Sequence, residues 1–348
     1  MIGLAPMDGI SDAAYRQIAD IYGKPDILIT EFVAVEGLTR NAVGLLHHFL
    51  KHKTTTPTIG QIYGAEVSSF YPATILLAEL GFDGVDINMG CPDKSVVKRG
   101  AGAGLIRTPE IAKQIIKEAQ RGVVDWSNGQ TLKGAGFSDK FISEVNRIKV
   151  DEPVRKLLPV SVKTRIGYDE ITTTEWIPHL IETRPARISI HGRTLKQMYS
   201  GFANWEEIGK ATELSHKANI PLFGNGDVKN KEGAIEKMKE YGVDGILIGR
   251  ATFGNPWALC GHIPTKMERL EVAIKHSDLF TKYFPTGNFH SLRKHLTWYT
   301  SSFANASKLR MELVKVESVK DVKQVISSFL KENPSELETD LDDIEKSV

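Results

Sequence analysis

The feature that most constrains the fold is a regular alternation between short β-rich runs and stretches of helical hydrophobic periodicity, continuing to about residue 255. This alternation is typical of α/β proteins whose parallel strands are joined by helices. The β-rich runs predict eight strands, at 2–5, 27–30, 58–63, 84–88, 160–164, 187–191, 221–224 and 245–248. Amphipathic stretches predict crossover helices at 12–22, 67–80, 109–120, 174–182, 205–217 and 231–241. Eight such repeats predict a closed (β/α)8 TIM barrel.

Two segments depart from the alternation. Residues 122–152 carry the turn signals Asn128-Gly129 and Gly134-Ala135-Gly136, and predict a surface insertion with a short helix near 140–148. After Pro264 the strand signals cease, and helical patterns such as 266–283 and 289–303 take over. We therefore predict a barrel domain at 1–264, a smaller helical domain at 265–330 and an acidic tail at 331–348, which we expect to be frayed or disordered.

Charge and cysteine content limit the classes of function. The net charge is +1, but residues 331–348 contribute seven acidic residues and two lysines, so the remainder carries +6. This mild basic excess is compatible with a nucleic-acid partner and equally with a metabolic enzyme. With only two cysteines and no Cys-x-x-Cys pair, we predict no disulfide framework and no metal site. No signal segment and no apolar run of roughly 18 residues is found, which predicts a cytoplasmic protein without membrane insertion.

Polar residues recur where the predicted strands end. In a (β/α)8 barrel these ends converge on one face, where active sites lie. One such residue alone would be more simply interpreted as a satisfied core polar group or a helix cap, but recurrence on separate strands favours a single pocket. The residues are Met7, Asp8, Gln61, Asn88, Cys91, Lys163, Arg165, His191, Asn225, Gly226, Asp227, Gly249 and Arg250.

Cys91 lies between Gly90 and Pro92, directly after the fourth predicted strand. Because Gly and Pro break the strand, we expect the thiol to lie on a turn, exposed and available for chemistry. The alternative is a buried structural cysteine. The turns Gly224-Asn225-Gly226-Asp227 and Ile248-Gly249-Arg250 follow the last two strands, where many barrels bind phosphate. Glycine admits backbone N–H groups to phosphate oxygens and arginine supplies a cationic fork, so a phosphorylated cofactor is indicated.

Taken in order, these motifs resemble the tRNA-dihydrouridine synthase family over nearly the whole barrel. The helical region, with Leu292-Arg293-Lys294-His295, Trp298-Tyr299 and Ala306-Ser307-Lys308-Leu309-Arg310, is most similar to the bacterial B-type subgroup. The barrel motifs are Ala5-Pro6-Met7-Asp8-Gly9, Gln61-Ile62-Tyr63-Gly64, Asn88-Met89-Gly90-Cys91-Pro92, Lys98-Arg99-Gly100-Ala101-Gly102, Val162-Lys163-Thr164-Arg165, His191-Gly192-Arg193-Thr194, Gln197-Met198-Tyr199-Ser200-Gly201, Gly224-Asn225-Gly226-Asp227 and Ile248-Gly249-Arg250.

The resemblance implies an enzyme that binds FMN, takes electrons from NADPH and reduces the C5–C6 double bond of particular uridines in tRNA. It implies that Cys91 is the general acid that protonates C5, and that Asn88 and Arg193 contact the uracil. It assigns Pro6, Met7, Asp8, Gln61 and Lys163 to the isoalloxazine, and His191, Asn225, Gly226, Asp227, Gly249 and Arg250 to the ribityl-phosphate side. A thiol with a pKa near 8.5 is largely protonated at neutral pH, which suits an acid.

The helical domain supplies cations next to aromatic residues. Arg293 and Lys294, beside Trp298 and Tyr299, suit contacts to tRNA phosphates and base stacking, although a solvated charged face around an aromatic anchor is the simpler interpretation without the resemblance. Two alternatives remain open: an FMN barrel acting on a small molecule of the dihydropyrimidine or dihydroorotate type, and a non-catalytic tRNA-binding protein. We expect a monomer. The modified uridine and the preference for NADPH over NADH are not fixed by the sequence.

Overall fold

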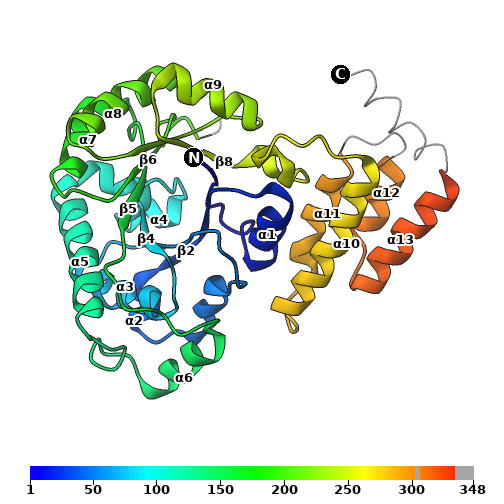
Figure 1. The fold of residues 1–348 in the computed structure, drawn as a ribbon, viewed down its shortest axis with the longest axis horizontal. Helices are drawn as coiled ribbons and strands as arrows, with labels where there is room; N and C mark the ends of the chain where they lie inside the picture. The colour runs from blue at the N-terminus through cyan, green and yellow to red at the C-terminus, as the bar shows by residue number, and fades with distance from the viewer. Residues whose placement is uncertain (199, 302–305, 334–348) are drawn as a thin grey trace.

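The computed structural model describes residues 1–198, 200–301 and 306–333 and contains a closed barrel of eight parallel strands in chain order (Figure 1). This confirms the predicted (β/α)8 fold. Tyr199 and residues 334–348 of the predicted acidic tail lie outside the described residues. The strands are β1 (Ile2–Leu4), β2 (Ile27–Ala34), β3 (Thr58–Tyr63), β4 (Gly84–Asn88), β5 (Val160–Arg165), β6 (Ile188–His191), β7 (Leu222–Asn225) and β8 (Gly245–Ile248).

Helices surround the barrel, and in the part of the chain that the structure describes four more α-helices follow it (Figure 1). The first group is α1 (Ala13–Ile18), α2 (Val35–Thr39), α3 (Phe70–Glu79), α4 (Lys94–Lys98), α5 (Pro109–Ser127), α6 (Asp139–Ile148), α7 (Thr173–Ile181), α8 (Trp205–Lys217) and α9 (Lys231–Tyr241). The second group is α10 (Lys266–Tyr283), α11 (Arg293–Tyr299), α12 (Ala306–Leu313) and α13 (Val319–Glu332). The helical region after the barrel is thus present, and the domain boundaries stay a prediction.

Helix α5 is longer than the sequence pattern indicated. It continues to Ser127 because Val123 and Trp126 extend its buried face beyond Ala119. The segment outside the βα repeat therefore begins at Asn128, not at 122, and contains α6 at the predicted position. Within the described residues, no helix is long and apolar enough to cross a membrane.

The alternation of side chains along the strands separates the barrel wall from its interior. In β4, Val85 and Ile87 pack into the large core that the surrounding helices cover. The one position between them is the polar Asp86, which is fully buried inside the barrel. Because side chains two residues apart share a face, the same alternation directs one side chain at the end of each strand toward the barrel axis.

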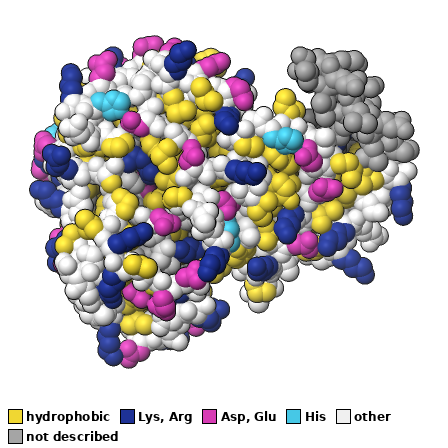
Figure 2. Space-filling view, in the orientation of Figure 1, with side chains coloured by type: hydrophobic (Ala, Val, Ile, Leu, Met, Phe, Trp, Pro, Cys, Tyr) yellow, Lys and Arg dark blue, Asp and Glu magenta, His cyan; other side chains and the backbone are white. Residues whose placement is uncertain are grey.

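The helical region packs directly against the barrel. Ala14 and Ile18 of α1 and Trp257 belong to the same buried apolar cluster as Leu270 of α10 and Leu296 of α11. The hydroxyl of Tyr283 also donates to the Gln17 amide oxygen at 2.9 Å. On the face shown in Figure 2, basic and acidic side chains are interspersed over both parts, without a single broad field of one sign.

Two histidines are buried at this junction. The Nδ1 atom of His276 lies 3.0 Å from the Tyr299 hydroxyl, and the His276 and His295 rings meet edge to face at 4.9 Å. The Tyr15 ring of α1 packs against both rings. Burial lowers the pKa of His276 to about 3 and holds the pKa of His295 well below its ordinary value. Both imidazoles are therefore neutral at neutral pH.

Acid should weaken this junction. In the unfolded chain His276 takes up a proton near pH 6.5, whereas in the folded protein it does so only near 3. The free energy of unfolding should therefore fall by about 1.4 kcal/mol per pH unit below 6.5, or about 2 kcal/mol at pH 5. Nearby Asp12, whose pKa burial raises to about 6, acts in the opposite direction. Urea unfolding at pH 6.5 and 5.0 should thus show a loss about 2 kcal/mol larger in the wild type than in His276→Gln. Equal losses would contradict the prediction.

Candidate active site

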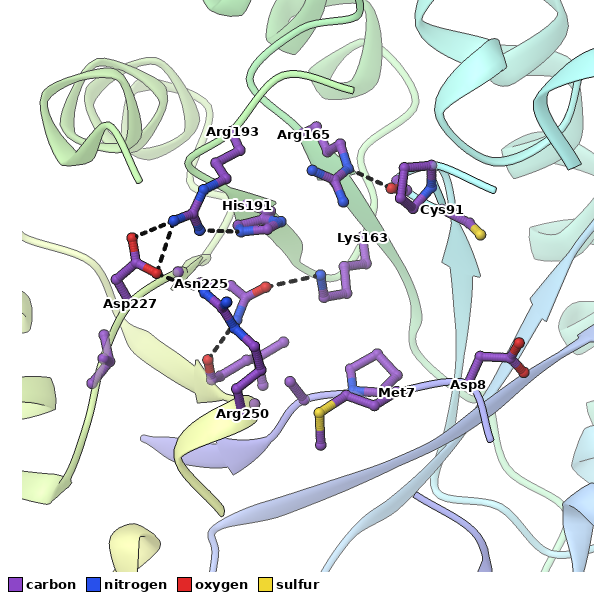
Figure 3. A pocket seen from close by; sticks show the side chains of 18 of the residues that line it. Met7, Asp8, Cys91, Lys163, Arg165, His191, Arg193, Asn225, Asp227 and Arg250 are labelled. Carbon is purple, nitrogen blue, oxygen red and sulfur yellow. Dashed lines mark hydrogen bonds and ion pairs between the residues drawn. The ribbon is translucent and has the colours of Figure 1, made fainter. Parts of the chain in front are cut away.

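A cavity of about 1190 Å³ opens at the carboxyl ends of the strands. Its walls come from strands β2, β4, β5, β6, β7 and β8 and from the segments that follow β1, β4, β6, β7 and β8; Figure 3 shows the labelled side chains among them. Of the predicted site residues, all except Gln61, Arg293 and Lys294 line it. Those that do are Pro6, Met7, Asp8, Asn88, Cys91, Lys163, His191, Arg193, Asn225, Gly226, Asp227, Gly249 and Arg250.

Gln61 lies beneath the cavity and supports its floor. Its side chain is fully buried; Nε2 donates to Asp86 at 2.6 Å, and Oε1 accepts from Nδ2 of Asn88 at 3.0 Å. The Asn88 oxygen in turn accepts the N–H groups of Gly90 at 3.0 Å and Cys91 at 2.8 Å. Both ends of the Asn88 amide are thus engaged within the protein. Gln61 and Asn88 together fix the turn that carries the thiol.

Cys91 is more enclosed than the sequence predicted. The expectation of an exposed thiol is wrong: Cys91 is 8% exposed, because Val96 of α4 and Ala101 after this helix pack against it. It nevertheless lines the cavity. Burial raises the pKa of the thiol, and the neighbouring Asp93 and Asp8 carboxylates act in the same direction. The thiol therefore retains its proton at neutral pH.

Lys163 is the cation at the centre of the cavity. Its Nζ donates to the Asn225 side-chain oxygen at 3.1 Å, and the two side chains point toward each other in Figure 3. Burial lowers the pKa of Lys163 to about 8, and neighbouring Arg165 adds to this effect. An anion placed against this ammonium would favour its charged form.

Arg165, one of the strand-end residues predicted to converge on a pocket, lines the cavity, and Ser11 is a supporting residue that the sequence did not single out. The Nε of Arg165 donates to the Gly90 carbonyl at 2.6 Å, so this buried side chain braces the turn that carries the thiol. The spacing to Lys163 was the available signal, because residues two apart on a strand face the same side. Ser11 is fully buried; its hydroxyl accepts the Met7 N–H at 2.9 Å and stabilises the loop after β1. A serine on that loop gave no comparable signal.

A chain of ion pairs forms the opposite wall. The Nη2 atom of Arg193, a residue only 2% exposed, donates to the two Asp227 oxygens at 3.0 and 2.7 Å. Arg250 donates to the same carboxylate at 2.9 Å. Burial alone would raise the pKa of Asp227, but the Ala203 N–H and the two guanidinium groups outweigh it and lower the pKa. Arg193, predicted to contact the uracil, thus lies in this ion-pair chain.

The neutral His191 ring lies next to this chain of ion pairs. Burial, together with the charges of Arg165, Lys163, Arg193 and Arg250, holds the pKa of His191 well below its ordinary value. Its Nε2 lies 3.4 Å from Nη1 of Arg193, so the ring nitrogen acts as an acceptor. A neutral imidazole here can accept or donate a hydrogen bond without adding a further positive charge.

The β7 turn needs glycine at one position. Gly226 has φ 132°, and a Cβ there would lie 2.6 Å from the Ala203 Cβ and 3.2 Å from the His191 ring. Its carbonyl accepts from the Trp205 indole at 3.1 Å, and the next residue, Asp227, adopts φ 55°. The turn therefore presents backbone, without a side chain, to this part of the cavity.

The electrostatic character of the cavity suits an anion. Lys163, Arg165, Arg193 and Arg250 line it, against the acidic Asp8, Asp93 and Asp227. The Arg250 side chain is 53% exposed and lies next to the Gly226 turn, where backbone and guanidinium can meet a phosphate. In the described part of the chain, no cluster of three or more His, Cys, Asp or Glu side chains could hold a metal ion.

Arg293 and Lys294 lie outside the cavity, in α11. Arg293 donates from Nε to the Val316 carbonyl at 2.8 Å and from Nη2 to the Lys315 carbonyl at 3.1 Å, so it ties α11 to the segment after α12. The Lys294 ammonium donates to the Gly9 carbonyl, next to Asp8 at the cavity rim. Both predicted tRNA contacts thus have partners within the protein, and their role toward RNA stays a prediction.

Comparison with known proteins identifies the family. Residues 3–131 and 139–333 match the family described as "Dihydrouridine synthase (Dus)". A Staphylococcus aureus (strain COL) protein named "Probable tRNA-dihydrouridine synthase" is 32% identical over 338 residues, covering 94% of this chain and 92% of that protein. A Bacillus subtilis (strain 168) protein named "Probable tRNA-dihydrouridine synthase 2" is 30% identical over 337 residues, covering 94% and 93%. The chain therefore belongs to the dihydrouridine synthase family, which confirms the resemblance drawn from the motifs.

Among solved structures, the "Crystal structure of DHODH in complex with ferulenol from Eimeria tenella" aligns with a TM-score of 0.39 and 10% identity, over 71% of this chain and 64% of that chain. A likeness this low carries no argument about fold or function.

Removing the Asp227 carboxylate should destabilise the protein. In Asp227→Ala the buried Arg193 guanidinium loses its counter-ion, and we expect the free energy of unfolding to fall by about 2–4 kcal/mol. The matched control is Glu118→Ala, which breaks the surface pair with Arg121 and should cost about 0–1 kcal/mol. Urea denaturation measures both. Equal small losses would show that the Arg193–Asp227 pair does not stabilise this wall.

Proposed function

We propose that this protein reduces the C5–C6 double bond of particular uridines in tRNA to 5,6-dihydrouridine, with FMN bound in the cavity and NADPH as electron donor. One observation carries the proposal: a protonated thiol and a phosphate-compatible wall face the same cavity. Cys91 lies on one side of it, and Gly226, Asp227 and Arg250 on the other. Family membership and the names of the relatives support the reaction.

The residues present fit a flavin mononucleotide. A single phosphate suits the Gly226 turn, where a Cβ would collide with Ala203 and the His191 ring and only backbone is presented, and the adjoining Arg250. Lys163 is a partly buried cation that can offset negative charge on the ring system, and neutral His191 and Asn225 supply polar contacts between Lys163 and the phosphate side. When bound, FMN supplies the hydride that adds to C6 of uracil.

Cys91 completes the reduction. Addition of hydride at C6 leaves negative charge across C5 and the C4 carbonyl, so C5 needs a proton. The Cys91 thiol can give that proton because burial raises its pKa and keeps it protonated. The resulting thiolate then takes up a proton from solvent. Asn88 and Arg165 hold the turn on which this transfer depends, through the Cys91 N–H and the Gly90 carbonyl respectively.

The tRNA must present one base at a time. A uridine stacked in folded RNA cannot offer its face to a ring inside the barrel, so the base has to leave the stack and enter the cavity. The helical region beside α1 offers the second surface that the rest of the tRNA needs. No observation supports the small-molecule or the non-catalytic alternative as strongly as the family assignment supports reduction of tRNA uridines.

Cys91→Ala should separate the two half-reactions. Flavin reduction by NADPH needs no proton from the thiol, whereas formation of dihydrouridine does, so the first should persist and the second should fall by about 10²–10⁴-fold. The matched control is Cys260→Ala, because this thiol lies outside the cavity near the Tyr22 carbonyl at 3.5 Å. Stopped-flow absorbance and dihydrouridine analysis of tRNA measure the two steps. Normal dihydrouridine formation by Cys91→Ala would remove Cys91 as the acid.

Arg250→Ala should weaken FMN retention. Loss of a charge-assisted contact to phosphate costs about 1.5–3 kcal/mol, or roughly 10- to 150-fold in Kd. Arg121→Ala, on the outer surface of α5, is the control and should leave the Kd unchanged. Fluorescence titration of the apoprotein gives the constants. Release of FAD or of no flavin from the purified protein, or an unchanged Kd in Arg250→Ala, would contradict the assignment.

A further inference from the structure

One aromatic ring at the cavity has no role in the fold. Phe202 lies between β6 and α8, lines the cavity and is 88% exposed, more than any other large apolar side chain in the described residues. Burying a phenylalanine is favourable, so this ring, exposed at the edge of the cavity, offers apolar area that a partner outside the chain would cover.

The exposure does not result from a loose backbone. On one side of Phe202, the Gly201 carbonyl accepts from Nη2 of the buried Arg193 at 2.7 Å. On the other side, the Ala203 N–H donates to Asp227 at 2.7 Å. Both contacts belong to the same ion pair that forms the cavity wall. The backbone on both sides of the ring is therefore held in place, which lowers the ordering cost of binding.

Phe253 makes the contrast clear. It also lines the cavity, but its ring stacks on Trp298 of α11 with centroids 4.2 Å apart and an interplanar angle of 9°. Its aromatic face is used inside the protein, where it joins the barrel to the helical region. Around Phe202, by comparison, no ring contact occurs in the part of the chain that the structure describes.

The surroundings of Phe202 indicate what it binds. Lys229 lines the same cavity and, being exposed, presents a cation near its opening. Aromatic rings combined with cations are the surface that single-stranded nucleic acid prefers, because bases stack and phosphates pair. A uridine drawn into the cavity brings its neighbouring nucleotides to the edge. We propose that Phe202 is the stacking platform for a nucleobase adjacent to the uridine being reduced, an inference that rests on the proposed function.

The first experiment distinguishes a failure of this inference from a failure of the proposed reduction of tRNA uridines. Wild-type protein is assayed for dihydrouridine formation on an unmodified tRNA transcript, and failure there would count against the proposed function alone. With activity present, Phe202→Ala should raise the KM for tRNA by about 5- to 150-fold, with a smaller change in kcat. Phe202→Trp should restore the wild-type KM, because stacking needs only an aromatic face.

Val154→Ala is the matched control. Val154 is 78% exposed but precedes β5, so it lies at the amino ends of the strands, opposite the cavity. Its KM should equal that of the wild type. An unchanged KM in Phe202→Ala would overturn the proposal. A slower reduction of the flavin by NADPH in Phe202→Ala, with tRNA affinity intact, would assign the ring to the dinucleotide and would equally overturn it.

A second measurement identifies the base. Transcripts with an abasic nucleotide on either side of the target uridine are compared, and one of them should bind the wild type as weakly as intact tRNA binds Phe202→Ala. That same transcript should lose nothing further with Phe202→Ala, since both changes remove one stacking contact. Additive losses with both transcripts would contradict the proposal. In Phe202→Trp, tRNA should also quench the new indole fluorescence, and no quenching would contradict direct stacking.

Discussion

Closure of the barrel between β1 and β8 is the constraint on which every other feature depends. Ile2 pairs with Ile246 and Leu4 with Ile248, so the sheet has no free edge and its strand ends form a ring. Side chains alternate along each strand, and Lys163 therefore meets Asn225 across the interior although they are 62 residues apart in the chain. The active-site cavity is a direct consequence of this closure and alternation.

Polar groups buried beneath and beside the cavity then fix its geometry. Asp86 accepts hydrogen bonds from Gln61 and Arg187 inside the barrel. Gln61 in turn accepts a hydrogen bond from Asn88, and Asn88 accepts the Cys91 N–H and so holds the turn in place. Such groups are costly to bury unless they are paired, so each one restricts the positions of its neighbours. The thiol is consequently placed by residues that never touch it. The other wall depends in the same way on one carboxylate between two guanidinium groups.

The sequence predicted the parts of the structure that local pattern controls. Strand periodicity located all eight strands, and the polar residues at their ends marked most of the cavity, because in a barrel those ends can go nowhere else. The sequence did not predict burial and side-chain partners that depend on tertiary contacts. Cys91 is buried because Val96 packs against it. Arg293 donates to a backbone carbonyl of a segment that follows later in the chain. Neither contact has a signature in the surrounding residues.

Nucleoside mapping detects whether the protein converts uridine to dihydrouridine within tRNA, which is the reaction proposed for this cavity. The protein would be expressed in cells that lack every dihydrouridine synthase of their own, and their tRNA analysed position by position by mass spectrometry. We expect a gain of two hydrogens at defined uridines with the wild-type chain. Unmodified tRNA, despite expression of a folded protein that retains FMN, would contradict it.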